Sequence, residues 1–245
     1  MQSQPMQADN ATIRSRPTLS RLATYLPLLA GLTAALLTWA FIQISIEMIE
    51  GDTRAFDLAI LRAAQSLRTG HPWVAEVMRD LSGLGSTAVL TLFTVIAVGY
   101  LAVVRARLTA LLVATAVITG SVGVSLLKTQ FDRARPDADL AVLVVPGMSF
   151  PSGHATIAAI VFLTVAALLA NTRSRALERT YILAMATMMA LLVGVSRIAL
   201  GVHWATDVAA GWAFGAAWAL AWLLLARRLS RRHARSIVTG GPHES

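Results

Sequence analysis

Cysteine is absent from this 245-residue chain, which excludes a disulfide framework and a thiolate metal site. Charge is scarce as well. Asp, Glu, Lys and Arg make up 14% of the residues, whereas an average soluble domain has about a quarter, and 56% of the chain is hydrophobic. Lysine occurs once, at Lys128, and the other basic residues counted in the net charge are all arginine. The composition therefore excludes an ordinary soluble domain and indicates a membrane protein.

The formal net charge of +8 raises the question of a nucleic-acid partner. The basic residues, however, are scattered between apolar runs and lack the interleaved aromatic residues of a single-strand-binding groove. An anionic membrane surface accounts for them better. We therefore expect a bilayer and no nucleic acid as the chain's surroundings.

Long apolar runs dominate the sequence, and a membrane helix needs about 20 consecutive apolar residues. Six runs qualify, so the predicted fold is an all-α polytopic membrane protein with six transmembrane helices, at about residues 22–46, 86–104, 108–127, 151–170, 180–197 and 205–226. Between the first two runs, Phe56, Leu58, Ile60 and Leu61 stand among charges. This pattern predicts one short interfacial helix, ending in a turn at residues 83–86.

The distribution of basic residues predicts the orientation, because cytoplasmic loops carry the excess of Lys and Arg. With both termini cytoplasmic, thirteen basic residues fall inside and eight outside. We accordingly divide the chain into a polar cytoplasmic tail (1–21), one six-helix membrane domain (22–226) and a basic cytoplasmic tail (227–245). In the last span, Gly211 and Gly215 form a GxxxG pattern that favours close helix packing.

The first chemically informative stretch, KTQFDRARP, directly follows the third span on the predicted outer side. Lys128, Arg133 and Arg135 concentrate positive charge where the orientation rule disfavours it. A lone lysine in an arginine-rich chain indicates a compact point charge, since the two side chains bind phosphate differently. The alternative is a lysine that extends toward the interface from a helix end.

The second stretch, SFPSGHATIA, opens the fourth predicted span. Proline suits the first turn of a helix, and Ser152 and Gly153 let backbone amides face a ligand. A helix N-terminus exposed in this way binds anions. His154 is then placed to protonate an oxygen that leaves the anion, although a capping or interfacial histidine would give the same pattern.

The third stretch, SRIALGVHWATD, joins the last two predicted spans. With a helix starting near Gly201, His203 and Asp207 stand at i and i+4 and share a face. The carboxylate then orients the imidazole, and His203 becomes a candidate nucleophile. A structural Asp–His or Asp–Arg pair is the alternative, because an aspartate in an apolar span needs a partner.

The three stretches gather three cations (Lys128, Arg135 and Arg197), a helix N-terminus, two histidines and one carboxylate at one membrane face. Two histidines and an aspartate match zinc ligands in type. Three neighbouring cations would repel a metal ion and instead neutralise the oxygens of a phosphoryl group. We favour phosphoryl transfer without a metal or other cofactor.

The pattern Lys128-x6-Arg135-Pro136, Pro151-Ser152-Gly153-His154 and Ser196-Arg197-x5-His203-x3-Asp207 resembles the three-part signature of the type 2 phosphatidic acid phosphatase superfamily. Every signature position is filled, and membrane members of that family also have six spans with the signature on the extracytoplasmic side.

The resemblance implies roles for eight residues. His203 would attack phosphorus and form a phosphohistidine, Asp207 would orient His203, and His154 would protonate the leaving oxygen. Phosphate oxygens would be bound by Lys128, Arg135, Ser152, the Gly153 amide and Arg197. The expected enzyme is a bacterial inner-membrane lipid phosphatase, with its active site facing the periplasm or outside.

The family includes phosphatases for undecaprenyl pyrophosphate, phosphatidylglycerophosphate, phosphatidic acid and the phosphates of lipid A. We therefore expect a lipid phosphate or pyrophosphate as substrate, with the undecaprenyl and phosphatidylglycerol lipids favoured. Two alternatives stay open: a lipid phosphotransferase using the same intermediate, and an ion- or proton-coupled transporter. Nothing in the sequence fixes an oligomeric state.

Overall fold

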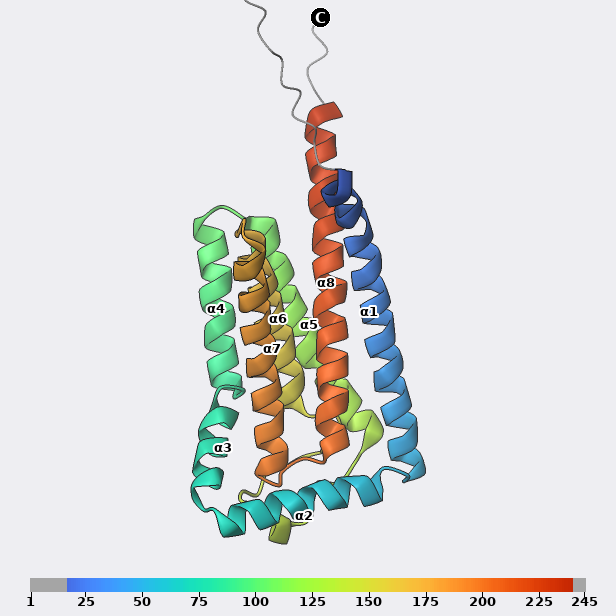
Figure 1. Ribbon diagram of the computed structural model, residues 1–245, viewed down its shortest axis with the longest axis vertical. Coiled ribbons are helices and arrows are strands. Elements are labelled where there is room, and N and C mark those ends of the chain that lie inside the picture. Colours follow the sequence, from blue (N-terminus) through green and yellow to red (C-terminus); the bar gives the residue numbers. More distant parts are fainter. Residues whose placement is uncertain (1–16, 240–245) are drawn as a thin grey trace, which may run out of the picture.

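The computed structural model describes the backbone of residues 17–239 and the side chains of residues 25 and 27–229. The regular secondary structure of this part of the chain is entirely helical, and loops connect the helices (Figure 1). In chain order the elements are α1 (Pro17–Glu50), α2 (Arg54–Gly70), α3 (Trp73–Gly83), α4 (Thr87–Val103), α5 (Arg107–Phe131), the 3-10 turn η1 (Ala138–Leu140), α6 (Gly153–Asn171), α7 (Ala176–Ala199) and α8 (Ala205–Thr239).

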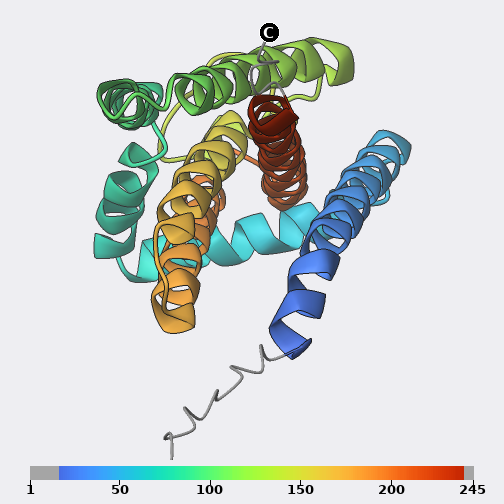
Figure 2. The ribbon, with the colours of Figure 1, turned by 90° about the horizontal axis from the view of Figure 1, so that it is seen from above.

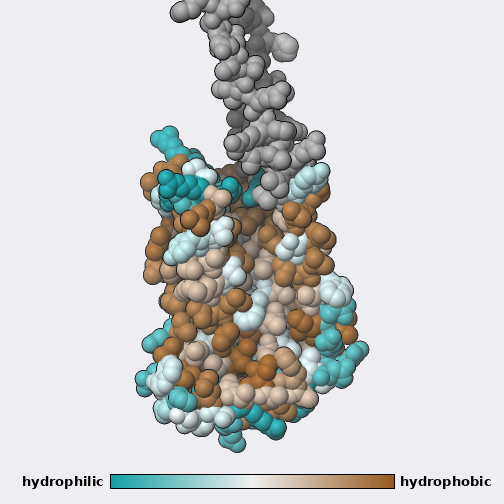
Figure 3. Space-filling model, viewed as in Figure 1, coloured by the Kyte–Doolittle hydropathy of each residue, from teal (hydrophilic) through white to brown (hydrophobic). Residues whose placement is uncertain are grey.

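Six helical segments of the described chain are long and apolar enough to cross a membrane: Pro27–Glu50, Trp73–Val103, Arg107–Phe131, Gly153–Asn171, Ala176–Ala199 and Ala205–Leu229. On the face seen in Figure 3, apolar side chains form a belt between two polar ends. The belt includes exposed large side chains such as Trp39 and Leu36 of α1. The predicted six-span helical fold is confirmed.

One helix, α2, lies between the first two spans, as predicted. The second span begins earlier than predicted, because α3 continues through a turn at residues 84–86 into α4 as part of that span. The turn has a packing reason, because a side chain at Gly85 would collide with Val193 of α7. Ser86 then caps α4 by accepting a hydrogen bond from the Val89 amide.

The ends of the described chain both lie toward the pole opposite α2 (Figure 1), apart from one another in the view from above (Figure 2). Helix α1 begins at Pro17, inside the predicted tail 1–21, and α8 continues to Thr239, inside the predicted tail 227–245. Residues 1–16 and 240–245 lie outside the described part. The three-part division of the chain stays a prediction.

Helix α2 crosses the end of the bundle and is attached near both of its ends (Figures 1 and 2). Near its start, the fully buried Asp57 accepts hydrogen bonds from the amide and hydroxyl of Thr206, at the N-terminus of α8. Near its end, Arg68 donates to the carbonyls of Ala199, at the C-terminus of α7, and Leu140. Each charge thus meets the helix end that stabilises it.

An aromatic cluster holds the segment between α5 and α6 against the bundle. Phe150, which is fully buried, lies with its ring centroid 4.9 Å from that of Phe131 and 6.0 Å from that of Phe41. Phe41 also contacts Phe214 of α8. These contacts fix Phe150 directly before the PSGH sequence.

Helix α6 is the central element, because it packs against both α7 and α8. The predicted close packing at the GxxxG pattern is confirmed. A Cβ atom at Gly215 would lie 2.5 Å from the Thr156 carbonyl oxygen, and one at Gly211 would lie 2.9 Å from that of Ser152. The two glycines let α8 approach the start of α6.

We therefore predict that Gly215→Ala destabilises the protein by about 1–3 kcal/mol, the usual cost of overpacking a tight contact. Gly99→Ala is the matched control, since Gly99 also lies within a helix and a Cβ there meets nothing within 4 Å. Thermal unfolding of the purified variants in detergent measures the difference. Equal melting temperatures for the two variants would contradict the packing argument.

Candidate active site

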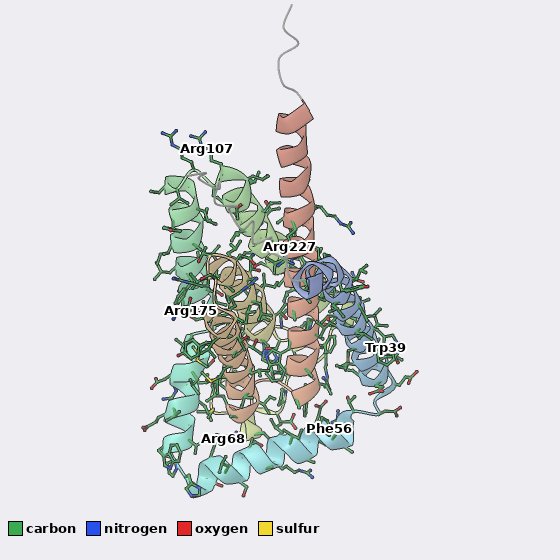
Figure 4. All side chains as sticks on the ribbon, turned by 45° about the horizontal axis from the view of Figure 1, so that its top comes forward. Trp39, Phe56, Arg68, Arg107, Arg175 and Arg227 are labelled. Atoms are coloured by element: carbon green, nitrogen blue, oxygen red, sulfur yellow. The ribbon has the colours of Figure 1, made fainter. Side chains whose placement is uncertain are left out.

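The eight predicted site residues gather at the end of the bundle that α2 crosses. Helices α5 and α7 end there, and α6 and α8 begin there. Arg68 and Phe56 mark this end in Figure 4, while Arg107, at the other end of α5, lies far from it. Three segments that are distant in the sequence therefore supply one site: Lys128 and Arg135; Ser152, Gly153 and His154; Arg197, His203 and Asp207.

The histidine–carboxylate pair forms, but by a different route from the one predicted. Helix α8 begins at Ala205 rather than near Gly201, so His203 precedes the helix and Asp207 is its third residue. Asp207 Oδ2 accepts a hydrogen bond from the Trp204 amide at 2.9 Å, as an acidic residue does in a capping box. The same oxygen lies 3.3 Å from His203 Nδ1. The cap of α8 thus aims the carboxylate at the imidazole.

The contact of the other ring nitrogen, Nε2, identifies the tautomer of His203. Arg135 Nη1 lies 3.1 Å from His203 Nε2. A guanidinium only donates hydrogen bonds, so Nε2 accepts and the ring proton sits on Nδ1, facing Asp207. His203 is therefore held neutral, with the lone pair of Nε2 directed toward the cations.

Electrostatics agree with a neutral imidazole. Burial lowers the pKa of His203 to about 4, outweighing the hydrogen bond and charge of Asp207, which act to raise it. Arg135 and Lys128 lower this pKa further. Burial also lowers the pKa of Arg135, although an arginine remains cationic.

The three cations have neutral partners. Lys128 Nζ donates to the Met148 carbonyl at 2.6 Å, Arg135 donates to the carbonyls of Gly147 and Val202, and Arg197 donates to the Ser82 hydroxyl. Within the described residues none of the three forms an ion pair with a carboxylate. Their charge is therefore uncompensated by acidic side chains and fits an anionic ligand.

The start of α6 has a geometry that refines the prediction. Gly153 is the first helical residue and Ser152 is the N-cap, so Pro151 lies just before the helix rather than in its first turn. The Ser152 amide donates to the Asp207 carbonyl, which leaves the following amides for a ligand. Ser152 Oγ makes no capping bond, and like Arg197 Nε it is buried without a hydrogen-bond partner. A phosphate oxygen would satisfy both donors.

Several contacts around the site were not predicted from the sequence. Arg133 Nη1 binds Asp207 Oδ1 at 2.6 Å, and its Nη2 binds Asp57 Oδ2 at 2.7 Å. Ser149 donates to Asp207 Oδ2, and Ser82 of α3 accepts from Arg197. Only Arg133 carried a sequence signal, its place in the outer cationic loop. The other contacts depend on tertiary structure.

The zinc alternative meets an obstacle in this geometry. Nε2 of His203 faces the Arg135 guanidinium, whose positive charge would repel a metal cation but would bind a phosphoryl group, and Nδ1 faces Asp207. In the described part of the chain, no group of three or more His, Asp and Glu side chains is arranged to hold a metal ion.

Comparison with known proteins identifies the family. The profile of the PAP2 superfamily matches residues 107–231, which include all eight site residues. The chain belongs to the PAP2 superfamily. It is 36% identical to phosphatidylglycerophosphatase B of Bacillus subtilis over 163 residues, covering 65% of this chain and 77% of that protein. It is also 31% identical to decaprenylphosphoryl-5-phosphoribose phosphatase of Mycobacterium tuberculosis, covering 65% and 85%.

Two crystal structures are similar to this one. The transmembrane PAP2-type phosphatidylglycerolphosphate phosphatase of Bacillus subtilis superposes with a TM-score of 0.72 at 28% identity, covering 82% of this chain and 96% of that chain. LpxE of Aquifex aeolicus gives a TM-score of 0.54 at 27% identity, covering 68% and 93%. The predicted family, the multi-pass membrane fold and the phosphatase class are confirmed.

The neutral state of His203 predicts a pH profile. A histidine with a lowered pKa stays neutral, and thus nucleophilic, at pH values where a free histidine would be protonated. We expect the fall of kcat/KM in acid that is due to the enzyme, the acid limb of its pH profile, to lie below pH 5. The reason is that His203 is protonated only as the pH drops through its pKa of about 4. Rates must be corrected for the substrate's own phosphate ionisation near pH 6. An enzyme limb at pH 6.5 or above would refute this.

The packing of the only lysine predicts that Lys128→Arg lowers kcat/KM by on the order of 100-fold although the charge is kept, a loss typical of misplacing a reacting group. Its Nζ donates to the Met148 carbonyl, and the longer, planar guanidinium of arginine would place its nitrogens elsewhere. Arg107→Lys, at the exposed far end of α5, is the control. Near-normal turnover of Lys128→Arg would show that charge alone suffices.

Proposed function

We propose that this protein is a metal-independent lipid phosphatase that hydrolyses phosphate or pyrophosphate esters through a phosphohistidine at His203. The observation that carries the proposal is the environment of this residue. His203 is buried and neutral, its Nδ1–H faces Asp207, and its Nε2 faces cations that have no acidic partners. This arrangement suits attack on a phosphoryl group.

In the first step, His203 Nε2 attacks phosphorus and the bond to the leaving oxygen breaks. Lys128, Arg135 and Arg197 neutralise the three non-bridging oxygens, helped by the Ser152 hydroxyl and the amide of Gly153. His154 gives its proton to the leaving oxygen. Asp207 stabilises the positive charge that develops on the imidazole of His203.

In the second step, water replaces the departed lipid. His154, now unprotonated, takes a proton from this water, whose oxygen attacks the phosphorus of the phosphohistidine. The P–N bond breaks, phosphate is released and His203 returns to its neutral state. The proton that the leaving oxygen gains in the first step comes from His154, and the proton that water loses in the second step returns to His154, so the cycle needs no metal-activated water.

A groove supports a lipid as the leaving group. It lies between α4, α5 and α6, has a volume of about 350 Å³, and is lined at one end by Lys128, Gly153 and His154. Its walls continue to Leu90 and Val117. Val117 precedes Lys128 by eleven residues on α5, which is a rise of about 16 Å along the helix. The groove thus leads from the proposed acid into the span.

The relatives support the same class of substrate, because their names describe phosphatases that act on lipid phosphates. The candidates for this chain are therefore a phosphatidylglycerophosphate, a polyprenyl phosphate derivative such as undecaprenyl pyrophosphate, and phosphatidic acid. His154, the proposed acid, lines the groove itself, which supports a lipid on the leaving-group side for each of these candidates.

The distribution of charge supports a location in the bacterial inner membrane with both termini in the cytoplasm. Arg105, Arg107, Arg173 and Arg175 follow or precede spans at the end of the bundle opposite α2, where the positive-inside rule expects the cytoplasm. The site would then face the periplasm. Its substrate would be a lipid of the outer leaflet.

A phosphotransferase would use the same phosphohistidine but transfer the phosphoryl group to an acceptor lipid. The transporter alternative finds no support, because the relatives are phosphatases and the ionisable side chains of the site lie at one mouth of the bundle rather than at the bilayer midplane.

The decisive test is release of inorganic phosphate by the detergent-purified protein in EDTA, with phosphatidylglycerophosphate, undecaprenyl pyrophosphate and phosphatidic acid as parallel substrates. We expect release that persists in EDTA and falls by at least about 1,000-fold in His203→Ala, as for loss of a nucleophile. Binding of a non-hydrolysable phosphonate analogue should persist in this variant.

Substantial turnover by His203→Ala would refute the nucleophile assignment. Dependence on an added acceptor lipid would identify a phosphotransferase. Loss of activity in EDTA that zinc restores would refute the metal-free mechanism.

A further inference from the structure

Arg133 stands beside the site but differs from the three phosphate-binding cations, because its charge is already compensated. Nη1 is bound by Asp207 Oδ1 at 2.6 Å and by the Thr206 hydroxyl at 2.8 Å, and Nη2 is bound by Asp57 Oδ2 at 2.7 Å. Its guanidinium carbon also lies 5.4 Å from the centre of the Trp204 ring. Arg133 is thus held by carboxylates rather than available to phosphate.

The contacts of Asp207 show what Arg133 contributes. Oδ2 receives the Ser149 hydroxyl, the Trp204 amide and His203 Nδ1, whereas Oδ1 receives Arg133. The carboxylate is fully buried. Without Arg133, Oδ1 would lose this charged donor, and the carboxylate could turn away from the imidazole.

Asp57 holds Arg133 from the other side. It reaches the site from α2, and its two oxygens also accept from the amide and hydroxyl of Thr206, next to Asp207 in the chain. Asp57 is fully buried and lies 150 positions before Asp207 in the sequence. The order of contacts is therefore Asp57, Arg133, Asp207 and His203, from the crossing helix to the proposed nucleophile.

We propose that Asp57 and Arg133 are positioning residues, which fix the Asp207 carboxylate so that His203 is oriented for attack. Through them the placement of α2 across the bundle controls the nucleophile. This inference rests on the proposed role of His203. It assigns to α2 a function in turnover besides covering the end of the bundle.

A pH profile distinguishes this role from structural damage. The charged and titratable groups that act on His203 are Asp207 from α8, Arg135 from the loop after α5, Lys128 from α5 and His154 from α6. Arg197 from α7 acts on His154, and Arg133 reaches His203 through Asp207. Removing the Arg133 charge leaves the Asp207 charge uncompensated, which favours protonation of His203. Removing the Asp57 charge leaves Arg133 uncompensated, which disfavours it. The two variants therefore change the pKa of His203 in opposite directions.

The experiment measures kcat, KM and the acid limb of kcat/KM for Arg133→Gln, Asp57→Asn and the control Arg54→Gln, using the lipid substrate that the wild type hydrolyses fastest. Arg54 and Arg133 both line a hollow between α2 and the loop after α5. Arg54 is exposed, however, and no ion pair connects it to the site. For Arg133→Gln we expect kcat to fall on the order of 100-fold with KM changed less than about 3-fold. Its acid limb should rise by about one pH unit.

For Asp57→Asn we expect a smaller fall in kcat and an acid limb that moves down or stays in place. Arg54→Gln should behave as the wild type. Wild-type kcat in Arg133→Gln, a rise in KM without loss of kcat, or acid limbs that move in the same direction in both variants would each overturn the proposal. Activity retained by His203→Ala would instead overturn the proposed mechanism.

A second readout covers the case in which Arg133→Gln folds poorly. Arg133 borders a hollow of about 270 Å³ that opens at this end of the molecule, between α2 and the loop after α5. Guanidinium ions at millimolar concentration should therefore partly restore kcat to Arg133→Ala, while equal concentrations of ammonium, lacking the planar fork, should not. Equal effects of the two ions, or none, would contradict the positioning role.

Discussion

The buried carboxylate of Asp207 is the interaction on which the remainder of the site depends. An isolated charge in this position would cost several kcal/mol, so its burial requires donors on all sides. The fold supplies them from four sources: the cap of α8, the Ser149 hydroxyl, the Arg133 guanidinium and His203. Stabilising this one anion simultaneously orders the turn before α8, the loop before α6 and the imidazole.

The helix ends provide the electrostatic framework around this anion. Two helices begin at the site and two end there. Asp57 of α2 meets the N-terminus of α8, and Arg68 of α2 meets the C-terminus of α7, so each charge meets a helix end of the favourable polarity. Glycines of α8 bring it close to the start of α6, so the phosphate-binding turn and the nucleophile come from directly packed helices. Packing in the apolar part of the bundle thereby determines distances in its polar end.

Sequence reasoning was most successful where the signal was local or compositional. The six spans follow from hydropathy, and the spacing of the three signature stretches led to the family. It was less successful where a contact joins distant segments. Asp57 looks like an ordinary charge on an amphipathic helix, and only the crossing of α2 over α8 brings it to Arg133. The predicted i, i+4 pairing of His203 with Asp207 placed the residues together for a wrong reason, because a cap rather than a helix face joins them.

The central claim is that His203 becomes covalently phosphorylated during turnover. The most direct measurement is a rapid alkaline quench of the enzyme during hydrolysis of its lipid substrate, a condition that preserves phosphohistidine, followed by peptide mass spectrometry. The account predicts phosphate on the peptide that contains His203, formed and lost at rates compatible with kcat. Phosphate on a different residue, or no phosphoenzyme together with inversion of configuration at phosphorus, would contradict it.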